Sequence, residues 1–231
     1  MPERLAKPWV TYALVAANVA MFVVELAQGA SLTSPTPRQI AELGGSYPPL
    51  TLGGQWWRLG SSMFLHYGVL HVGLNMVCLY QARVVEQLFG RLGFLAIYLV
   101  AGLGGGIATL VASPHAVAAG ASGAVFGVYG GFGAFLVLRR AQIEPEAWKQ
   151  TARSIGQFLL INLAFGLIAS GIALSAHVGG LVVGFAAGAA LLAGAKAQAQ
   201  RPLRALAVAV VGVALTAGAV AVMMASTPIQ T

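Results

Sequence analysis

The most constraining feature of this chain is a stretch with no charged residue, which runs from Leu92 to Leu138 between Arg91 and Arg139. An α-helix rises about 1.5 Å per residue, so one helix of this length would be about twice the ~30 Å thickness of a bilayer's hydrocarbon core. The stretch therefore predicts two membrane-spanning helices. Pro114 and the small residues around it supply the break between them.

The rest of the chain has the same character. Of its 231 residues, 58% are hydrophobic and 8% are charged, a balance outside the range of soluble globular domains. Residues 31–65, rich in Pro and Gly, are expected to form a long interfacial loop. Spans are expected at about 9–24, 69–87, two within 92–138, two within 154–195 that divide at 169–171, and 205–224. We predict an all-α polytopic membrane protein with seven spans.

The basic residues indicate the orientation of these spans. A cytoplasmic N-terminus puts eleven of the 13 basic residues inside, a strong positive-inside bias. Inside fall Arg4, Lys7, Arg83, Arg91, Arg139, Arg140, Lys149, Arg153, Lys196, Arg201 and Arg204, and outside fall Arg38 and Arg58. Orientation in the bilayer thus explains the net charge of +7, and no nucleic-acid partner is expected. A signal peptide ending near residues 27–30 is the alternative for the first apolar run, which is long enough to span.

Several kinds of catalytic site are excluded by residues that the sequence lacks. The chain contains no aspartate, so it has no intramembrane aspartyl dyad, and none of its four histidines begins an H-E-x-x-H motif. Cys78 is the single cysteine and has no partner for a disulfide. We expect no metal and no cofactor.

Four polar residues on three different spans are predicted to share the outer half of the membrane. They are His71, Asn75, Ser122 and His177, with Ser122 a turn or two below the outer end of its span. A lone membrane serine ordinarily bonds its own helix backbone, but polar groups at this depth are costly and tend to be functional. Their coincidence at one depth on three helices indicates a site.

Glycines spaced four residues apart are expected to bring two of these spans together. Such stripes let helix backbones approach closely in lipid. They comprise Gly123, Gly127 and Gly131 on one span and Gly180, Gly184 and Gly188 on another. Close approach is plain helix packing, and it is also what a hydroxyl and an imidazole need for proton transfer.

The chemistry that these residues suit is acyl transfer. Ser122 would be the nucleophile and His177 the base that activates it, a dyad because no aspartate is available. The oxyanion of the tetrahedral intermediate needs hydrogen-bond donors, and His71, Asn75 and the Ser122 backbone N–H are suitable. Gly123 beside the nucleophile leaves room for a substrate backbone.

These motifs resemble those of the rhomboid family of intramembrane serine proteases, over about residues 9–195. The matching segments are Trp57-Arg58, His71 to Asn75, Gly120 to Gly123, Ala176 to Gly180, and Glu86 with Gly90, where Ala82 replaces the family's first glycine. An aspartate that many relatives carry shortly before the second catalytic residue is absent from residues 172–175.

The resemblance implies a role for each site residue. Ser122 and His177 would be the catalytic dyad, and His71 and Asn75, with Gly120 and Gly123 beside the nucleophile, would form the oxyanion and substrate-binding site. Phe126 stands where members often carry an aromatic ring that packs on the catalytic histidine, although a core or lipid-facing ring fits the sequence equally well. His66 is expected to be structural.

The resemblance also implies an architecture and a substrate class. A six-helix catalytic core would occupy residues 1–195, with an interfacial loop at 29–65, and residues 196–231 would add a linker, a further helix and a tail. The expected substrates are single-pass membrane proteins, cut within or near the outer end of their transmembrane helix. The protein itself is expected to lie in a bacterial plasma membrane with its active site facing the outside. A proteolytically inactive relative that binds transmembrane clients, or a small channel or transporter with a polar cavity, is the alternative.

The orientation yields a first prediction. After an odd number of spans from a cytoplasmic N-terminus, the C-terminus lies outside. A reporter that is active only in the cytoplasm should therefore be silent when fused after Thr231, and the same reporter fused after Arg140 should be active. Strong activity of the Thr231 fusion would overturn the orientation.

Overall fold

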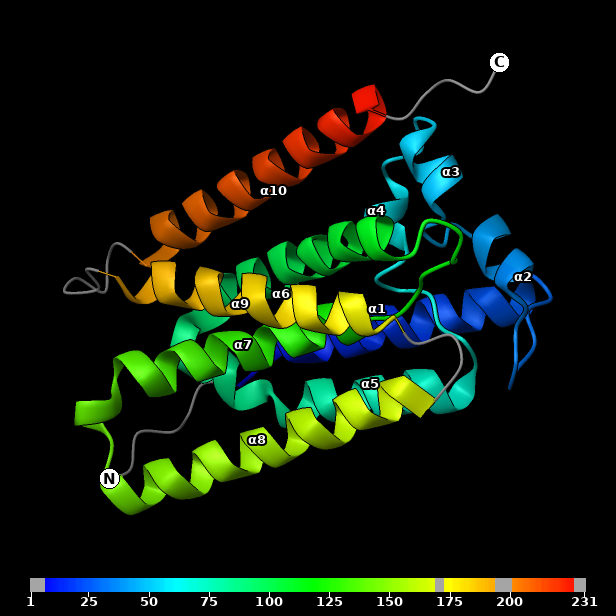
Figure 1. Ribbon diagram of the computed structural model, residues 1–231. Coiled ribbons are helices and arrows are strands. Elements are labelled where there is room, and N and C mark those ends of the chain that lie inside the picture. Colours follow the sequence, from blue (N-terminus) through cyan, green and yellow to red (C-terminus); the bar gives the residue numbers. More distant parts are fainter. Residues whose placement is uncertain (1–6, 169–172, 194–200, 227–231) are drawn as a thin grey trace.

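The computed structural model describes residues 7–168, 173–193 and 201–226. These residues form an all-helical protein, as predicted (Figure 1). The helices are α1 (Trp9–Ala27), α2 (Pro37–Glu42), α3 (Pro48–Leu52), α4 (Arg58–Ser61), α5 (Val69–Gln81), α6 (Arg83–Ala112), α7 (Ser122–Leu138), α8 (Pro145–Ile168), α9 (Leu174–Leu192) and α10 (Arg201–Ser226).

Four of these helices, α1, α6, α9 and α10, are long and apolar enough to cross a membrane. The shorter apolar helices α5 and α7 have 13 and 17 residues. Gly90 interrupts α6 with a φ of 75°, where the predicted spans 69–87 and 92 onward meet. The break predicted at 169–171 lies outside the described residues, between the end of α8 and the start of α9. The count of seven spans stays a prediction.

The charge-free stretch of residues 92–138 is divided between two helices, as the thickness of a bilayer requires. Helix α6 ends at Ala112 and α7 begins at Ser122, with Pro114 in the segment between them. The break leaves two helices of 30 and 17 residues in place of one that no bilayer could accommodate. Part of the 30-residue helix precedes Gly90 and belongs to the preceding predicted span.

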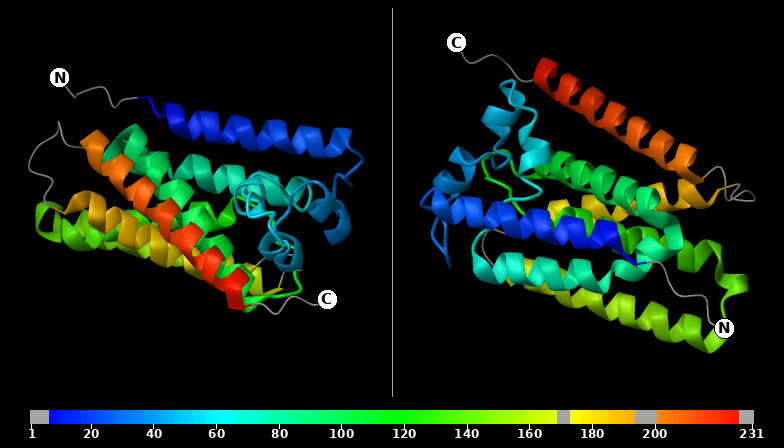
Figure 2. Two further views of the ribbon diagram at one scale, coloured as in Figure 1. Left: turned by 90° about the horizontal axis from the view of Figure 1, so that it is seen from above. Right: turned by 180° about the vertical axis from the view of Figure 1, so that it is seen from behind.

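The centre of the bundle is formed by α6, α7 and α9, which pack side by side (Figure 1, Figure 2). Helix α10 lies along α6 on one side of this centre, and α8 lies on the opposite side. The approach of α7 to α9 is limited by backbone atoms. A β-carbon on Gly180 would collide with the carbonyl oxygen of Gly123, and one on Gly184 would collide with that of Gly127. The glycine stripes therefore set the distance between the two helices that carry Ser122 and His177.

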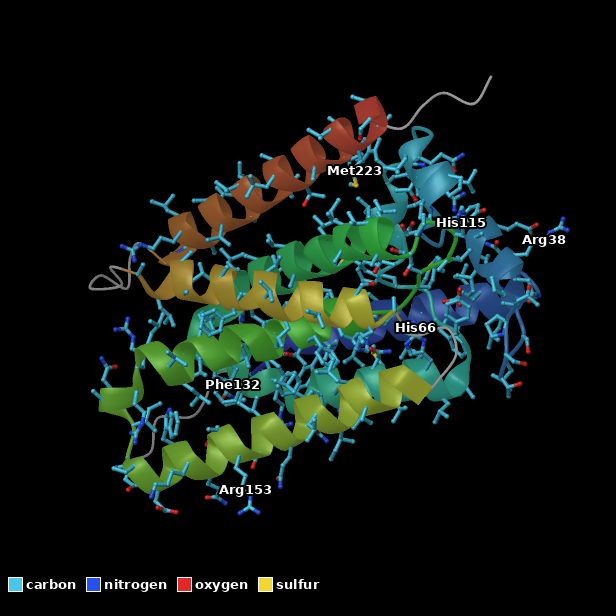
Figure 3. All side chains as sticks on the ribbon, in the orientation of Figure 1. Arg38, His66, His115, Phe132, Arg153 and Met223 are labelled. Atoms are coloured by element: carbon cyan, nitrogen blue, oxygen red, sulfur yellow. The ribbon has the colours of Figure 1, made fainter. Side chains whose placement is uncertain are left out.

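The loop end of the bundle comprises α2, α3, α4 and residues 113–121 (Figure 1). Residues 31–65, expected to be a loop, thus contain three short helices. Arg58 is buried there and donates from Nη1 to the carbonyl oxygens of Ala41 and Gly45, at 2.6 and 2.9 Å. Its guanidinium satisfies carbonyls that the turns leave unpaired. Among the labelled side chains of Figure 3, His66 and Arg38 lie at this end and Arg153 lies toward the other.

Helix α1 is fixed at its first turn by a buried carboxylate. Glu86 accepts the backbone N–H of Val10 at 3.0 Å and that of Thr11 at 2.8 Å, together with the Thr11 hydroxyl at 2.8 Å. The N–H groups of a first helical turn have no carbonyl partner within the helix and attract negative charge. Glu86 therefore joins α1 to α6 at the end of the bundle opposite the loop end.

The contact between α7 and α9 makes a prediction about stability. In Gly184→Ala the added methyl group meets the backbone of Gly127, so a helix must move, and we expect a loss of about 1–3 kcal/mol. A β-carbon on Gly218 of α10 meets nothing within 4 Å, which makes Gly218→Ala the matched control. Thermal unfolding in detergent should show a lower midpoint for Gly184→Ala alone. Equal midpoints for the two variants would contradict this packing.

Candidate active site

Ser122 is the first residue of α7. Its depth of a turn or two below the outer end of the span stays a prediction. The preceding residues follow a different path because other segments hold them. Ser46 and Ala118 exchange backbone hydrogen bonds of 2.9 and 2.7 Å, and the Gly120 N–H donates to the carbonyl of Ser62 at 2.9 Å. Gly120 then turns into the helix with a φ of 132°, a conformation that favours glycine. The serine thus lies where the loop end meets the bundle.

A small cavity of about 30 Å³ opens beside Ser122, large enough for a water molecule or two. Its wall is made by the loop end and by α5, α6, α7 and α9. Predicted site residues in this wall are His71, Gly120, Ser122 and Gly123, and the hydroxyl-bearing residues Ser46, Ser62 and Thr109 also line it. Side chains from distant parts of the sequence therefore share a polar space between the helices.

His71 faces Ser122 across Gly120. A β-carbon on Gly120 would lie 2.8 Å from Cε1 of His71, 3.1 Å from its Nε2 and 3.6 Å from Oγ of Ser122. Nδ1 of His71 accepts the backbone N–H of Tyr67 at 3.2 Å. A neutral imidazole that accepts at one nitrogen carries its proton on the other, which we therefore assign to Nε2. His71 consequently presents a hydrogen-bond donor on the side of Ser122.

His177 lies on α9, the helix packed against α7, and only 4% of its surface is exposed. Its ring stacks on Phe126 with the centroids 4.2 Å apart and the planes 7° from parallel. Neither ring nitrogen has a hydrogen-bond partner among the described residues, so no bond joins it to Ser122. Gly123 packs against the backbone of Ala176, next to the histidine. The ring is thus held by stacking, and neither of its nitrogens bonds a described residue.

Three predicted site residues, Asn75, Phe126 and His177, do not line the cavity. The position of Asn75 is explained by a bond within its own helix. Asn75 is buried on α5, and its Nδ2 donates to the carbonyl oxygen of His71 at 2.9 Å, one turn earlier. The spacing i, i+4 does place the two side chains on one helix face. The amide nevertheless bonds its own helix, the ordinary behaviour of a polar side chain in lipid.

The loop residues next to His71 are uncharged near neutral pH. Burial lowers the pKa of His66 to about 3 and raises the pKa of Tyr67 to about 12. The rings of His66 and His71 meet edge to face with their centroids 5.3 Å apart. The neutral His66 ring therefore adds no positive charge beside His71.

Besides the hydroxyl-bearing residues of the cavity wall, two further residues near the site, Glu25 and Tyr67, were not singled out in the sequence. Glu25 of α1 is fully buried and accepts the backbone N–H of His66 at 3.1 and 3.2 Å through its two oxygens. Tyr67 supplies the backbone donor to His71. An acidic residue inside an apolar span is itself a signal of function, so Glu25 could have been singled out. The backbone N–H of Tyr67 leaves no trace in a sequence.

These features define a multi-pass helical membrane protein with a serine and two histidines gathered near one end of the bundle. Residues 53–194 match the Rhomboid domain. Over 190 residues the chain is 37% identical to the rhomboid protease GluP of Bacillus subtilis, an alignment that covers 80% of this chain and 35% of that protein. It is 29% identical over 218 residues to the mitochondrial RHOMBOID-like protein 6 of Arabidopsis thaliana, covering 80% and 69% of the two chains.

A third relative, rhomboid-like protease 2 of Toxoplasma gondii, is 31% identical over 176 residues, which cover 74% of this chain and 61% of the relative. The chain therefore belongs to the rhomboid family, as its motifs predicted. It spans about a third of the length of the Bacillus subtilis protein.

The gap between His71 and Ser122 leads to a prediction for Gly120. A methyl group in Gly120→Ala must displace the His71 ring, and covalent labelling of Ser122 by a fluorophosphonate should slow at least tenfold. Gly54 also has a positive φ, 108°, but a β-carbon there meets nothing within 4 Å. Gly54→Ala, the matched control, carries similar backbone strain and should label at the wild-type rate. Equal rates for the two variants would show that the gap is unimportant.

Proposed function

We propose that this protein is an intramembrane serine endopeptidase in which Ser122 and His177 form the catalytic dyad. The observation that carries the proposal is the shared cavity of Ser122 and His71, which sets a nucleophile beside a hydrogen-bond donor. The His177 ring, whose nitrogens bond no described residue, lies on the helix packed against that of Ser122 and supports the assignment of His177 as base. Membership of the rhomboid family supports the proposal of a protease.

In the proposed reaction, Oγ of Ser122 attacks the carbonyl carbon of the scissile peptide bond while the His177 ring takes the hydroxyl proton. The tetrahedral intermediate collapses, the carbon–nitrogen bond breaks, and the imidazolium returns its proton to the leaving amine. Water then attacks the acyl-enzyme with His177 as base again, releasing the acid and the free serine. The His177 ring must be neutral at the start of acylation and again at the start of deacylation. Activity therefore requires deprotonated His177.

The oxyanion would be stabilised from two directions. Nε2–H of His71 is one donor, and the backbone N–H groups of Ser122 and Gly123 belong to a first helical turn, whose N–H groups lack intrahelical partners. Asn75 would contribute only after its amide leaves the His71 carbonyl, or it would act by holding that helical turn. Phe126 would support the His177 ring by stacking.

The proposed substrates are single-pass membrane proteins, cut within or near the outer end of their transmembrane helix. Helices with weak outer segments suit this best, because intact i to i−4 hydrogen bonds keep the scissile carbonyl from the site. In this proposal a six-helix core forms residues 1–195, and α10 is an additional span. The protein would lie in a bacterial plasma membrane with its site facing outward.

An inactive family member that binds transmembrane clients is the second candidate. It would need no functional dyad, yet both Ser122 and His177 are present and lie on closely packed helices. A channel with a polar cavity, the third reading, needs a continuous path, whereas the cavity of about 30 Å³ holds a water molecule or two.

Graded losses test the proposal. Ser122→Ala and His177→Ala should each abolish cleavage of a transmembrane substrate with a helix-weakened outer segment, since dyad members act as a unit. Asn75→Ala should retain residual activity, because one oxyanion donor is worth about 10²–10³ in rate. Cleavage by purified protein in detergent or liposomes is the measurement.

The control for these losses is substrate binding by Ser122→Ala, which should match the wild type because a small residue suits the helix packing at that position. The protease proposal fails if wild-type protein cleaves nothing yet binds weakened transmembrane segments equally well with and without Ser122. The client-binding reading would then stand.

A further inference from the structure

Glu25 is a buried carboxylate whose position helix stability does not explain. It lies in the last turn of α1, where the helix dipole disfavours negative charge, and none of its surface is exposed. Burial of an ionisable group is costly unless hydrogen bonds compensate for it. Both of its oxygens accept the same backbone N–H, that of His66, at 3.1 and 3.2 Å.

The next N–H along the chain reaches the site. While the His66 N–H donates to Glu25, the Tyr67 N–H donates to Nδ1 of His71 at 3.2 Å. The Tyr67 hydroxyl also donates to the carbonyl of Val117 at 2.7 Å, in the segment that leads to the nucleophile. The N–H groups of two consecutive residues thus have side-chain acceptors: Glu25 accepts that of His66, and His71 accepts that of Tyr67.

We propose that Glu25 is a positioning residue that acts through His71. By holding the peptide of His66, it aims the Tyr67 N–H at Nδ1 of His71 and so keeps the proton of that ring on Nε2, facing Ser122. A hydrogen bond to one imidazole nitrogen sets which nitrogen carries the proton. The inference rests on the proposed function, in which His71 Nε2–H stabilises the oxyanion.

Glu86 of α6 provides a matched control at the other end of α1. It too is a buried carboxylate that accepts backbone N–H groups of a neighbouring segment, but it does so at the first turn of α1, at the opposite end of the bundle. Glu25→Leu and Glu86→Leu each remove a carboxylate and leave buried N–H groups unpaired. Both are expected to lower stability, and only Glu25→Leu should change the site.

The first measurement does not depend on catalysis. Nitrogen NMR of the ring-labelled histidines, with His71 assigned from His71→Ala, should show a proton on Nε2 and a bare Nδ1 in wild type and in Glu86→Leu. Glu25→Leu should show a mixture of tautomers, and Glu25→Gln, which keeps an acceptor oxygen, should resemble the wild type. An unchanged His71 tautomer in Glu25→Leu would overturn the inference, whether or not the protein cleaves a substrate.

The second measurement is a double-mutant cycle on the cleavage rate. Glu25→Leu should lower kcat about tenfold with KM within twofold, and in a His71→Ala background the same change should lower kcat less than twofold. Equal losses in both backgrounds, or an equal loss in Glu86→Leu, would mean that Glu25 acts only on stability. If Glu25→Leu does not fold, Glu25→Asp replaces it. That side chain is one methylene shorter, so its carboxylate lies farther from the His66 N–H, and it remains polar.

If the wild type cleaves nothing, the proposed protease function has failed, and the tautomer measurement still decides the role of Glu25. If the wild type cleaves and the His71 tautomer responds to Glu25 but kcat does not, Glu25 does not position a catalytic donor. Either result contradicts a different part of the account.

Discussion

The site depends on the direct approach of two helix backbones in an apolar environment. Lipid supplies no hydrophobic force between helices, so α7 and α9 associate through close packing, and close packing needs surfaces without side chains. Gly123 and Gly127 meet Gly180 and Gly184 so closely that one methyl group would separate them. This close approach also limits the separation of Ser122 on α7 from His177 on α9. The packing that stabilises the bundle therefore brings the helices of these two residues together.

A second constraint is the cost of unpaired backbone groups away from water. The protein meets it at both ends of α1 with a carboxylate, Glu86 at the first turn and Glu25 at the last. At the loop end, the Arg58 guanidinium donates hydrogen bonds to two backbone carbonyls. These buried groups hold the irregular segments in place, and one of those segments carries the backbone donor to His71.

The fold class was predictable because bilayer thickness leaves so few alternatives. The uncharged run from residue 92 to 138 had to be two helices, and the structure confirms the break near Pro114. The family was predictable from motifs whose order along the chain is specific. The exact start of α7 was not, because it depends on the hydrogen bond from Gly120 to Ser62, a contact between distant segments. The orientation of the Asn75 amide, and the role of the Tyr67 backbone, likewise come from tertiary structure alone.

The most direct test is an experimental structure of the protein after reaction with a fluorophosphonate. The phosphonyl oxygen mimics the oxyanion of acyl transfer, and in this account the phosphorus is bonded to Oγ of Ser122. We expect that oxygen within about 3.2 Å of Nε2 of His71, with the His177 ring still stacked on Phe126 and one of its nitrogens facing the former hydroxyl. An adduct on another residue, or a phosphonyl oxygen directed away from His71, would contradict the account.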